Sequence, residues 1–143
     1  MKFPYSKYFL GRPSRLFGSY VEYPTVNIDL INPSNGRIAT NYIVLVDSGA
    51  AMCVFHANIA ESLGIDVESV IPMPLRGVGP FPGKHFVHTI ELVLGGHHTI
   101  LEAGFSYDLN IPFGLLGQKG FFEKFRICFD LPKRDFEIVP KER

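Results

Sequence analysis

Asp47 and Ser48, followed by Gly49 and Ala50, come directly after the apolar segment of residues 43–46. A carboxylate at the end of an apolar strand lies at the edge of a dry interior, where its charge is costly unless hydrogen bonds compensate it. Ser48 offers a hydroxyl, and Gly49 lets another backbone approach closely because it has no Cβ. Asp47 is therefore a candidate catalytic group. A structural alternative stays open, since Asp and Ser also close turns onto their own backbone after strands.

Short strands are expected to position this run. The 14 glycines and 11 prolines are spread along the chain as turn residues rather than gathered in a disordered tract. Turn residues 32–36, which end in Asn-Gly, predict a hairpin between 21–31 and 37–46. Segment 43–46 lacks alternation, which is typical of a strand covered on both faces. Further strands are expected over 52–55, 86–94, 97–106, 127–129 and 136–139.

Helix is expected in two places only. Apolar residues at helical spacing before Gly64 predict a helix over 56–63. The segment 118–125 is expected to form a second short helix, with its phenylalanines on the buried side. The sequence therefore predicts a mostly β domain with one or two short helices.

Length and composition indicate an ordinary globular protein. The chain has 143 residues, of which 46% are apolar and 20% charged. Fourteen cations balance 14 acids, which argues against nucleic acid or an anionic membrane as a partner. No tract approaches the ~18 apolar residues that a membrane span needs. Two cysteines, Cys53 and Cys128, form no disulfide framework, so we expect a cytoplasmic protein in which both thiols are buried.

The first twenty residues differ in composition from the rest. They carry four cations before any acid, mixed with Phe and Tyr, and have no signal-peptide pattern. We interpret residues 1–20 as an N-terminal arm that packs its aromatic side chains on the body, in preference to an arm that binds nucleic acid. Residues 21–143 then form the single domain.

Other reactive side chains give no convincing site. The five histidines have no converging partners at a recognised spacing, so we expect surface or turn positions and no metal, and no cofactor motif is present. No serine stands in a Gly-x-Ser-x-Gly elbow. Cys53 lies near His56 in the sequence, but its apolar surroundings indicate a core residue rather than a catalytic thiol. The histidines are His56, His85, His88, His97 and His98.

The run over residues 43–65, IVLVDSGAAMCVFHANIAESLGI, resembles the active-site region of retropepsin-like aspartic proteases, in particular their cellular and bacterial branch. Leu115-Leu116-Gly117 resembles the second motif of that family, an apolar pair and a glycine. The resemblance covers roughly residues 21–140. It implies a closed or folded barrel-like acid-protease domain.

The resemblance also implies a substrate-covering flap and a set of supporting residues. Gly77, Val78 and Gly79 lie where the family places its flap, and two prolines follow them. Ser48, Gly49 and Ala50, together with Leu116 and Gly117, would support the active-site loop. Gln118 stands where many members carry an arginine that braces this loop.

Aspartic proteolysis requires two carboxylates that share one proton. The chain has a single Asp-Ser-Gly triplet, so the resemblance implies a twofold homodimer in which each subunit supplies one Asp47. Ser48 would bond across the axis, and the chain termini would contribute to the dimer base.

These features predict a homodimeric aspartic endopeptidase that hydrolyses extended or unfolded polypeptides. The alternative is a non-enzymatic dimeric module that binds a peptide or protein on the same fold.

Overall fold

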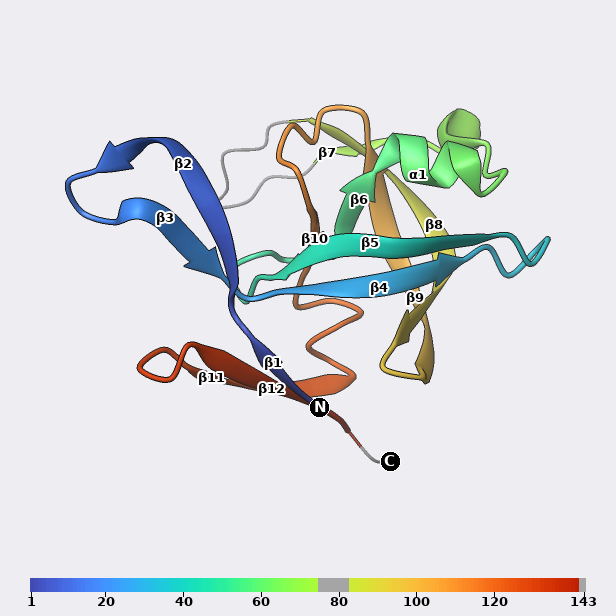
Figure 1. Cartoon of the computed structure of the whole chain (residues 1–143). Coiled ribbons are helices and arrows are strands. Elements are labelled where there is room, and N and C mark those ends of the chain that lie inside the picture. The colour runs from blue at the N-terminus through green and yellow to red at the C-terminus, as the bar shows by residue number, and fades with distance from the viewer. Residues whose placement is uncertain (75–82, 142–143) are drawn as a thin grey trace.

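The structure is a computed structural model that describes residues 1–74 and 83–141. Segments of alternating apolar residues, joined by turns that contain glycine, form a barrel of six strands. The strands follow the order β4-β5-β10-β6-β9-β8, and β4 pairs with β8 to close the barrel (Figure 1). The predicted fold class, mostly β with a closed barrel and few helices, is confirmed. The barrel strands are β4 (Thr25–Ile31), β5 (Ile38–Val46), β6 (Val54–His56), β8 (Lys84–Leu94), β9 (His97–Ser106) and β10 (Gly114–Leu116).

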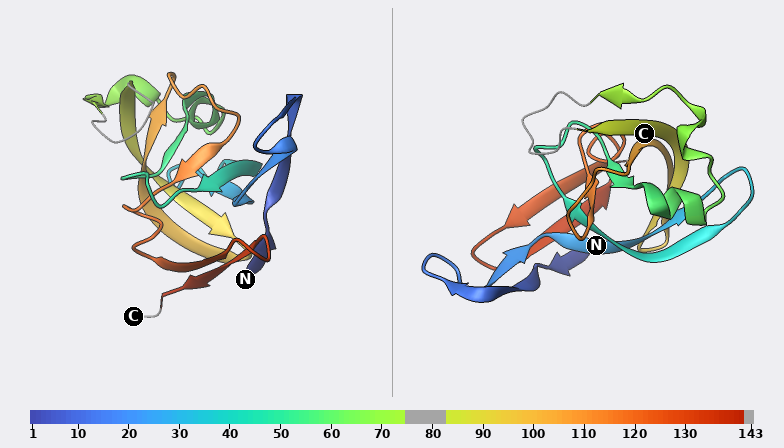
Figure 2. Two further views of the ribbon diagram at one scale, coloured as in Figure 1. Left: turned by 90° about the vertical axis from the view of Figure 1, so that its left-hand side faces the viewer. Right: turned by 90° about the horizontal axis from the view of Figure 1, so that it is seen from above.

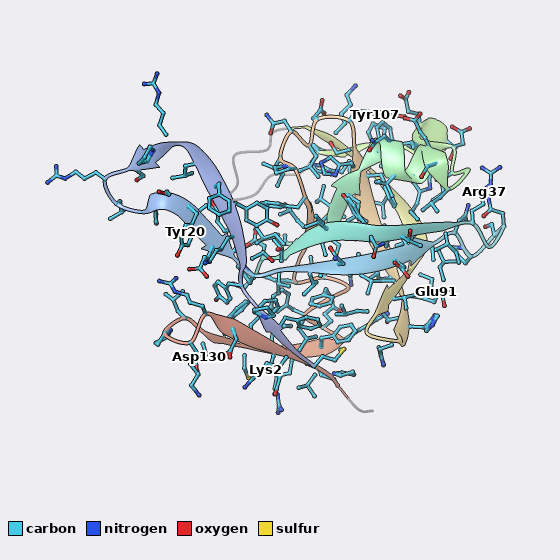
Figure 3. The ribbon with its side chains drawn as sticks, viewed as in Figure 1. Lys2, Tyr20, Arg37, Glu91, Tyr107 and Asp130 are labelled. Atoms are coloured by element: carbon cyan, nitrogen blue, oxygen red, sulfur yellow. The ribbon has the colours of Figure 1, made fainter. Side chains whose placement is uncertain are left out.

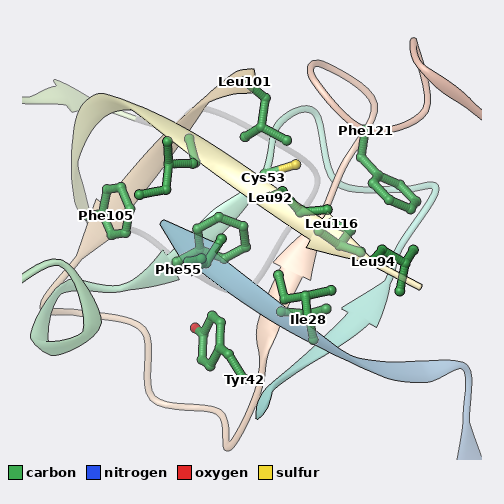
Figure 4. Close-up of a cluster of buried hydrophobic side chains, with 14 of the residues drawn as sticks. Ile28, Tyr42, Cys53, Phe55, Leu92, Leu94, Leu101, Phe105, Leu116 and Phe121 are labelled. Carbon is green, nitrogen blue, oxygen red and sulfur yellow. The ribbon is translucent and has the colours of Figure 1, made fainter. Parts of the chain in front are cut away.

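The barrel encloses the main hydrophobic core. Its largest fully buried side chains come from strands far apart in the sequence, which ties the barrel wall together (Figure 4). Burial of each such side chain stabilises the fold by roughly 1.5–3 kcal/mol. They include Ile28, Leu30, Phe55, Ile90, Leu92, Phe105 and Leu116.

Between Tyr42 and Val46, only one face of strand β5 is fully buried. Tyr42, Val44 and Val46 point into the core, whereas Ile43 between them is 42% exposed. The prediction that residues 43–46 are covered on both faces is therefore wrong at Ile43. The inward face alone fixes the strand, because side chains alternate between the two faces.

The chain termini lie outside the barrel and form two small sheets (Figure 2). One contains β1 (Lys2–Pro4), β12 (Asp135–Pro140) and β11 (Phe125–Asp130), in that order. The other is a hairpin of β2 (Ser6–Ser14) and β3 (Gly18–Tyr23). The proposed arm boundary after residue 20 falls inside β3.

The short elements around residues 57–74 cover one end of the barrel. Helix α1 (Ala57–Ser62) confirms the predicted first helix, and the 3-10 turn η1 (Val67–Ser69) follows it. Strand β7 (Met73–Pro74) pairs antiparallel with the start of β8. The predicted flap residues Gly77, Val78 and Gly79 lie outside the described residues.

The predicted helix over 118–125 is wrong. Phe122 and Glu123 bond to carbonyls five positions earlier, and the segment forms turns. Gly120 has a φ of +93°, a conformation that interrupts a right-handed helix. The buried side was predicted correctly for Phe121 and Phe125.

Within the described residues, none of the helices has both the length and the apolar character to cross a bilayer.

Candidate active site

Asp47 lies immediately beyond the carboxyl end of β5. Its backbone N–H donates to the carbonyl of Leu116 at 3.0 Å, which continues the pairing of β5 with β10. The N–H of Gly49 donates to Asp47 Oδ1 at 2.9 Å. Among residues 1–74 and 83–141 this is the one hydrogen bond that the carboxylate receives, so Oδ2 is left for another partner. The side chain is half-buried at the protein surface.

Strand β10 holds the loop that carries Asp47. It lies between β5 and β6, parallel to β5 and antiparallel to β6, so it separates two strands that are neighbours in sequence. Beyond β10, the N–H groups of Gln118 and Lys119 donate to the carbonyls of Ala50 and Ala51 at 2.8 and 2.9 Å. The loop is therefore fastened to residues 116–119 along most of its length.

Gly117 allows this close approach. A Cβ at that position would lie 2.8 Å from the carbonyl oxygen of Ala50 and closer still to the carbonyl of Met52. Its N–H points to Cys53 Sγ at 3.4 Å. The structure thus brings together Asp47, Ser48, Gly49 and Ala50 with Leu116 and Gly117, which lie in two motifs far apart in the sequence.

Gln118 contributes a contact that the sequence analysis did not predict. Its side-chain Nε2 donates to the carbonyl oxygen of Ser48 at 2.8 Å. The hydroxyl of Ser48 is exposed and makes no hydrogen bond with the described residues. The signal for this contact in the sequence is the resemblance to retropepsin-like proteases, many of which carry a loop-bracing residue at this position.

An apolar row lies on the face of the sheet that Asp47 extends. Leu45 precedes Asp47 by two positions and therefore shares its face. Leu115 stands opposite Leu45 on β10, and Val54 stands opposite Leu115 on β6. These side chains pack with Met52, Leu109, Val87 and Ile111 in a cluster separate from the barrel core. Most of this cluster is buried, and Leu45, Val87 and Ile111 are its half-buried members.

Two histidines have structural roles. His56 Nδ1 lies 2.6 Å from the hydroxyl of Tyr42 and His56 Nε2 lies 2.7 Å from the carbonyl of Ile111, so both ring nitrogens are satisfied. His88 Nε2 lies 2.8 Å from the carbonyl of Val67. Burial raises the pKa of the Tyr42 hydroxyl, which keeps it neutral in this network.

His85 departs from the expected surface or turn position. It is 2% exposed, and neither ring nitrogen has a hydrogen-bond partner in the described part of the chain. Burial lowers the pKa of His85, while the nearby Asp108 carboxylate opposes that shift. His85 lies at the start of β8, where it pairs with Met73 of β7, and its side chain lies against Gly104 of β9.

The two thiols have opposite environments. Cys53 is fully buried, and burial raises its pKa to about 11, which agrees with a core residue and not with a nucleophile. Cys128 is exposed on β11, so the expectation that both thiols are buried is wrong for Cys128. Over residues 1–74 and 83–141, no group of three or more His, Cys, Asp or Glu side chains is placed to hold a metal ion.

No protein-family model matches the chain, and no curated protein matches it. Among solved structures, the crystal structure of a retropepsin-like aspartic protease from Rickettsia conorii is similar, with a TM-score of 0.54 and 17% sequence identity. The match covers 96% of this chain and 95% of that chain. The chain therefore has a retropepsin-like fold.

Proposed function

We propose that the chain is an aspartic endopeptidase that is active as a homodimer, with one Asp47 from each subunit. The observation that carries the proposal is the Asp47–Gly49 loop. It presents a half-buried carboxylate at the end of a core strand, with one oxygen bonded to the Gly49 N–H and the other available. The retropepsin-like fold supports the same reading.

The chemistry follows from two carboxylates placed side by side. Like charges ~3 Å apart cannot both ionise, so the pair shares one proton and titrates as a unit. The ionised carboxylate takes a proton from a water molecule, whose oxygen attacks the peptide carbonyl carbon. The protonated carboxylate donates to the carbonyl oxygen. The tetrahedral intermediate then collapses as the C–N bond breaks: the carboxyl that took the proton from water passes it to the amine, and the other carboxylate takes one hydroxyl proton back, so the acid product forms and the pair again shares one proton.

The apolar cluster beside Asp47 suits an extended polypeptide. Leu45, Val87 and Ile111, the half-buried members of this cluster, would contact substrate side chains, while the substrate backbone supplies hydrogen bonds. Peptides with apolar residues flanking the cleaved bond are therefore the preferred class of substrate.

The direct test compares wild type with Asp47→Asn on a denatured protein substrate from pH 3 to 8. Asp130→Asn is a matched control, because Asp130 also follows strand residues and accepts a backbone N–H, that of Lys133, at 3.2 Å. Cleavage should vanish in Asp47→Asn and persist in Asp130→Asn. Cleavage that survives in Asp47→Asn would exclude the proposal.

A mixing experiment tests whether two copies of Asp47 form one site. Wild type is mixed with a growing excess of Asp47→Asn protein at constant wild-type concentration, after time for subunit exchange. Mixed dimers contain one carboxylate, so activity per wild-type chain should fall in proportion to the wild-type fraction. Unchanged activity would mean that one chain suffices.

If a folded wild-type dimer cleaves nothing over this pH range, the alternative of a peptide-binding module on the same fold takes its place.

A further inference from the structure

The β2/β3 hairpin, residues 6–23, projects from the body and exposes apolar side chains, Phe9 halfway along its length and Leu16 and Phe17 at its tip. Phe9, Leu16 and Phe17 are 76%, 82% and 60% exposed. The tip is ordered, because the N–H groups of Leu16 and Phe17 both donate to Ser14 Oγ at 3.1 Å. Phe9 stacks edge-to-face on Tyr20, at 5.7 Å between ring centroids. The backbone at the tip and the ring of Phe9 are therefore positioned, and all three apolar side chains lie outside the hydrophobic core.

The base of this hairpin lies beside the candidate active site. The N–H of Val46, the last residue of β5, donates to the carbonyl of Pro24 at 2.9 Å. Tyr8 and Tyr23 pack on Phe113, directly before β10. The hairpin leaves the barrel beside the C-terminal end of β5 (Figure 1). Figure 3 shows Tyr20 on this projecting hairpin. With nine residues in β2 and ~3.3 Å per residue, its tip extends roughly 25 Å from this base.

The hairpin and the rest of the chain have opposite charge. The hairpin, residues 6–23, holds three of the 14 cations and one of the 14 acids, a formal net charge of +2. The other residues therefore hold 11 cations and 13 acids, a formal net charge of −2. A second copy of this chain thus offers a surface of complementary charge to the hairpin.

The terminal strands are already paired within one chain. Lys2, Phe3 and Pro4 pair with Glu137, Phe136 and Asp135, and the N–H of Tyr5 donates to the carbonyl of Arg134 at 2.8 Å. Strand β1 therefore has its partner in its own chain. The hairpin, by contrast, is exposed, and its base at Pro24 is bonded to Val46, the residue before Asp47.

From these observations we infer that the β2/β3 hairpin is a dimerisation arm, which grips a second copy of the chain and brings the second Asp47 to the first. The inference rests on the proposed function in one respect, the need for a second Asp47. Phe9, Leu16 and Phe17 supply the apolar contact, and Arg12 and Arg15 orient the approach to the acidic body of the partner.

The test measures self-association of the full chain by sedimentation velocity over a range of concentrations. All proteins carry Asp47→Asn, so self-cleavage plays no part, and the protein with this change alone serves as the wild-type reference for the hairpin. The combined variant Phe9→Ser, Leu16→Ser, Phe17→Ser should weaken the dimer at least tenfold. A matched control, Ile38→Ser with Ile100→Ser, removes side chains that are 57% and 47% exposed on barrel strands and should leave the dimer unchanged.

A second variant, Arg12→Glu with Arg15→Glu, keeps the apolar tip. It should weaken the dimer severalfold at 0.1 M salt and much less at 1 M, since the screening length falls from about 10 Å to about 3 Å. Thermal unfolding of each variant, followed by circular dichroism, shows that the barrel is folded.

The outcomes separate this inference from the proposed function. A wild-type dimer that the two hairpin variants weaken supports the inference, even if the active protein with Asp47 cleaves nothing. A wild-type dimer that both variants leave intact overturns it, even if cleavage is found. A wild-type monomer at every concentration also overturns it, and binding of that monomer to anionic vesicles or DNA would assign the hairpin to those partners.

Discussion

The side-chain amide of Gln118 donates a 2.8 Å hydrogen bond to the carbonyl oxygen of Ser48, seventy positions earlier in the chain. The contact joins the two motifs at the point where the Asp47 loop turns back toward β6. A neutral amide thus braces the loop where many retropepsin-like proteases use an arginine. We therefore expect the loop to require a hydrogen-bond donor at this position rather than a positive charge.

Gln118→Ala should therefore lower proteolytic activity at least tenfold while costing only about 0.5–1.5 kcal/mol of stability, the worth of one hydrogen bond. Gln118→Arg keeps a donor within reach and should retain most activity. Cleavage rates and urea unfolding of both variants check this. Equal activity in Gln118→Ala and wild type would show that the bond does not position Asp47.

Gly117→Ala should destabilise the protein by about 1–3 kcal/mol, because its Cβ would overlap the carbonyls of Ala50 and Met52. The urea midpoint measures the loss. Gly11→Ala is the control, since nothing lies within 4 Å of a Cβ there. An unchanged midpoint in Gly117→Ala would mean that the loop can shift to accept a side chain.

His85 should weaken the protein in acid. Burial lowers its pKa in the folded state, so below its ordinary pKa of 6.5 the unfolded chain takes up a proton that the folded chain does not. The contribution of this group to stability is therefore present above pH 6.5 and is lost as the pH falls.

The melting temperatures of wild type, His85→Met and His85→Gln at pH 7.5 and 5.5 check this prediction. Both variants should lose less stability in acid than wild type. Only His85→Met should also gain stability at pH 7.5, because it removes the unpartnered polar ring. Parallel losses in all three proteins would rule out His85 as the source.

The two cysteines should react at very different rates. At pH 8 a thiol reagent should label exposed Cys128 within minutes and leave Cys53 unmodified, because Cys53 is buried and its pKa is raised to about 11. Mass spectrometry counts the labels, and denaturant should expose the second thiol. Two labels on the folded protein would contradict the burial of Cys53.

The sequence predicts the β8–β9 hairpin closely, because its alternation is regular and Gly95 and Gly96 adopt the positive φ that the turn requires. It misses the break at Pro24, where one apolar stretch becomes β3 and β4 in two different sheets. Pro24 is a local signal of a break, since proline cannot donate to a strand ladder, but it does not show that the segments on its two sides join different sheets.

The candidate site is only partly readable from the sequence. Asp47 and Gly117 stand out through their types and neighbours. The Gln118–Ser48 bond and the exposure of Ile43 depend on which distant segments meet, and a local pattern does not contain that information.

The position of β10 between β5 and β6 has a consequence for the order of events during synthesis. Asp47 and its loop leave the ribosome long before Leu116, Gln118 and Lys119. Four of the hydrogen bonds that shape the loop are nevertheless made with these three later residues. A nascent chain that has emerged only as far as β9 therefore carries the carboxylate without its final geometry. In the proposed protease, an unfinished chain would therefore lack the loop geometry that peptide hydrolysis requires.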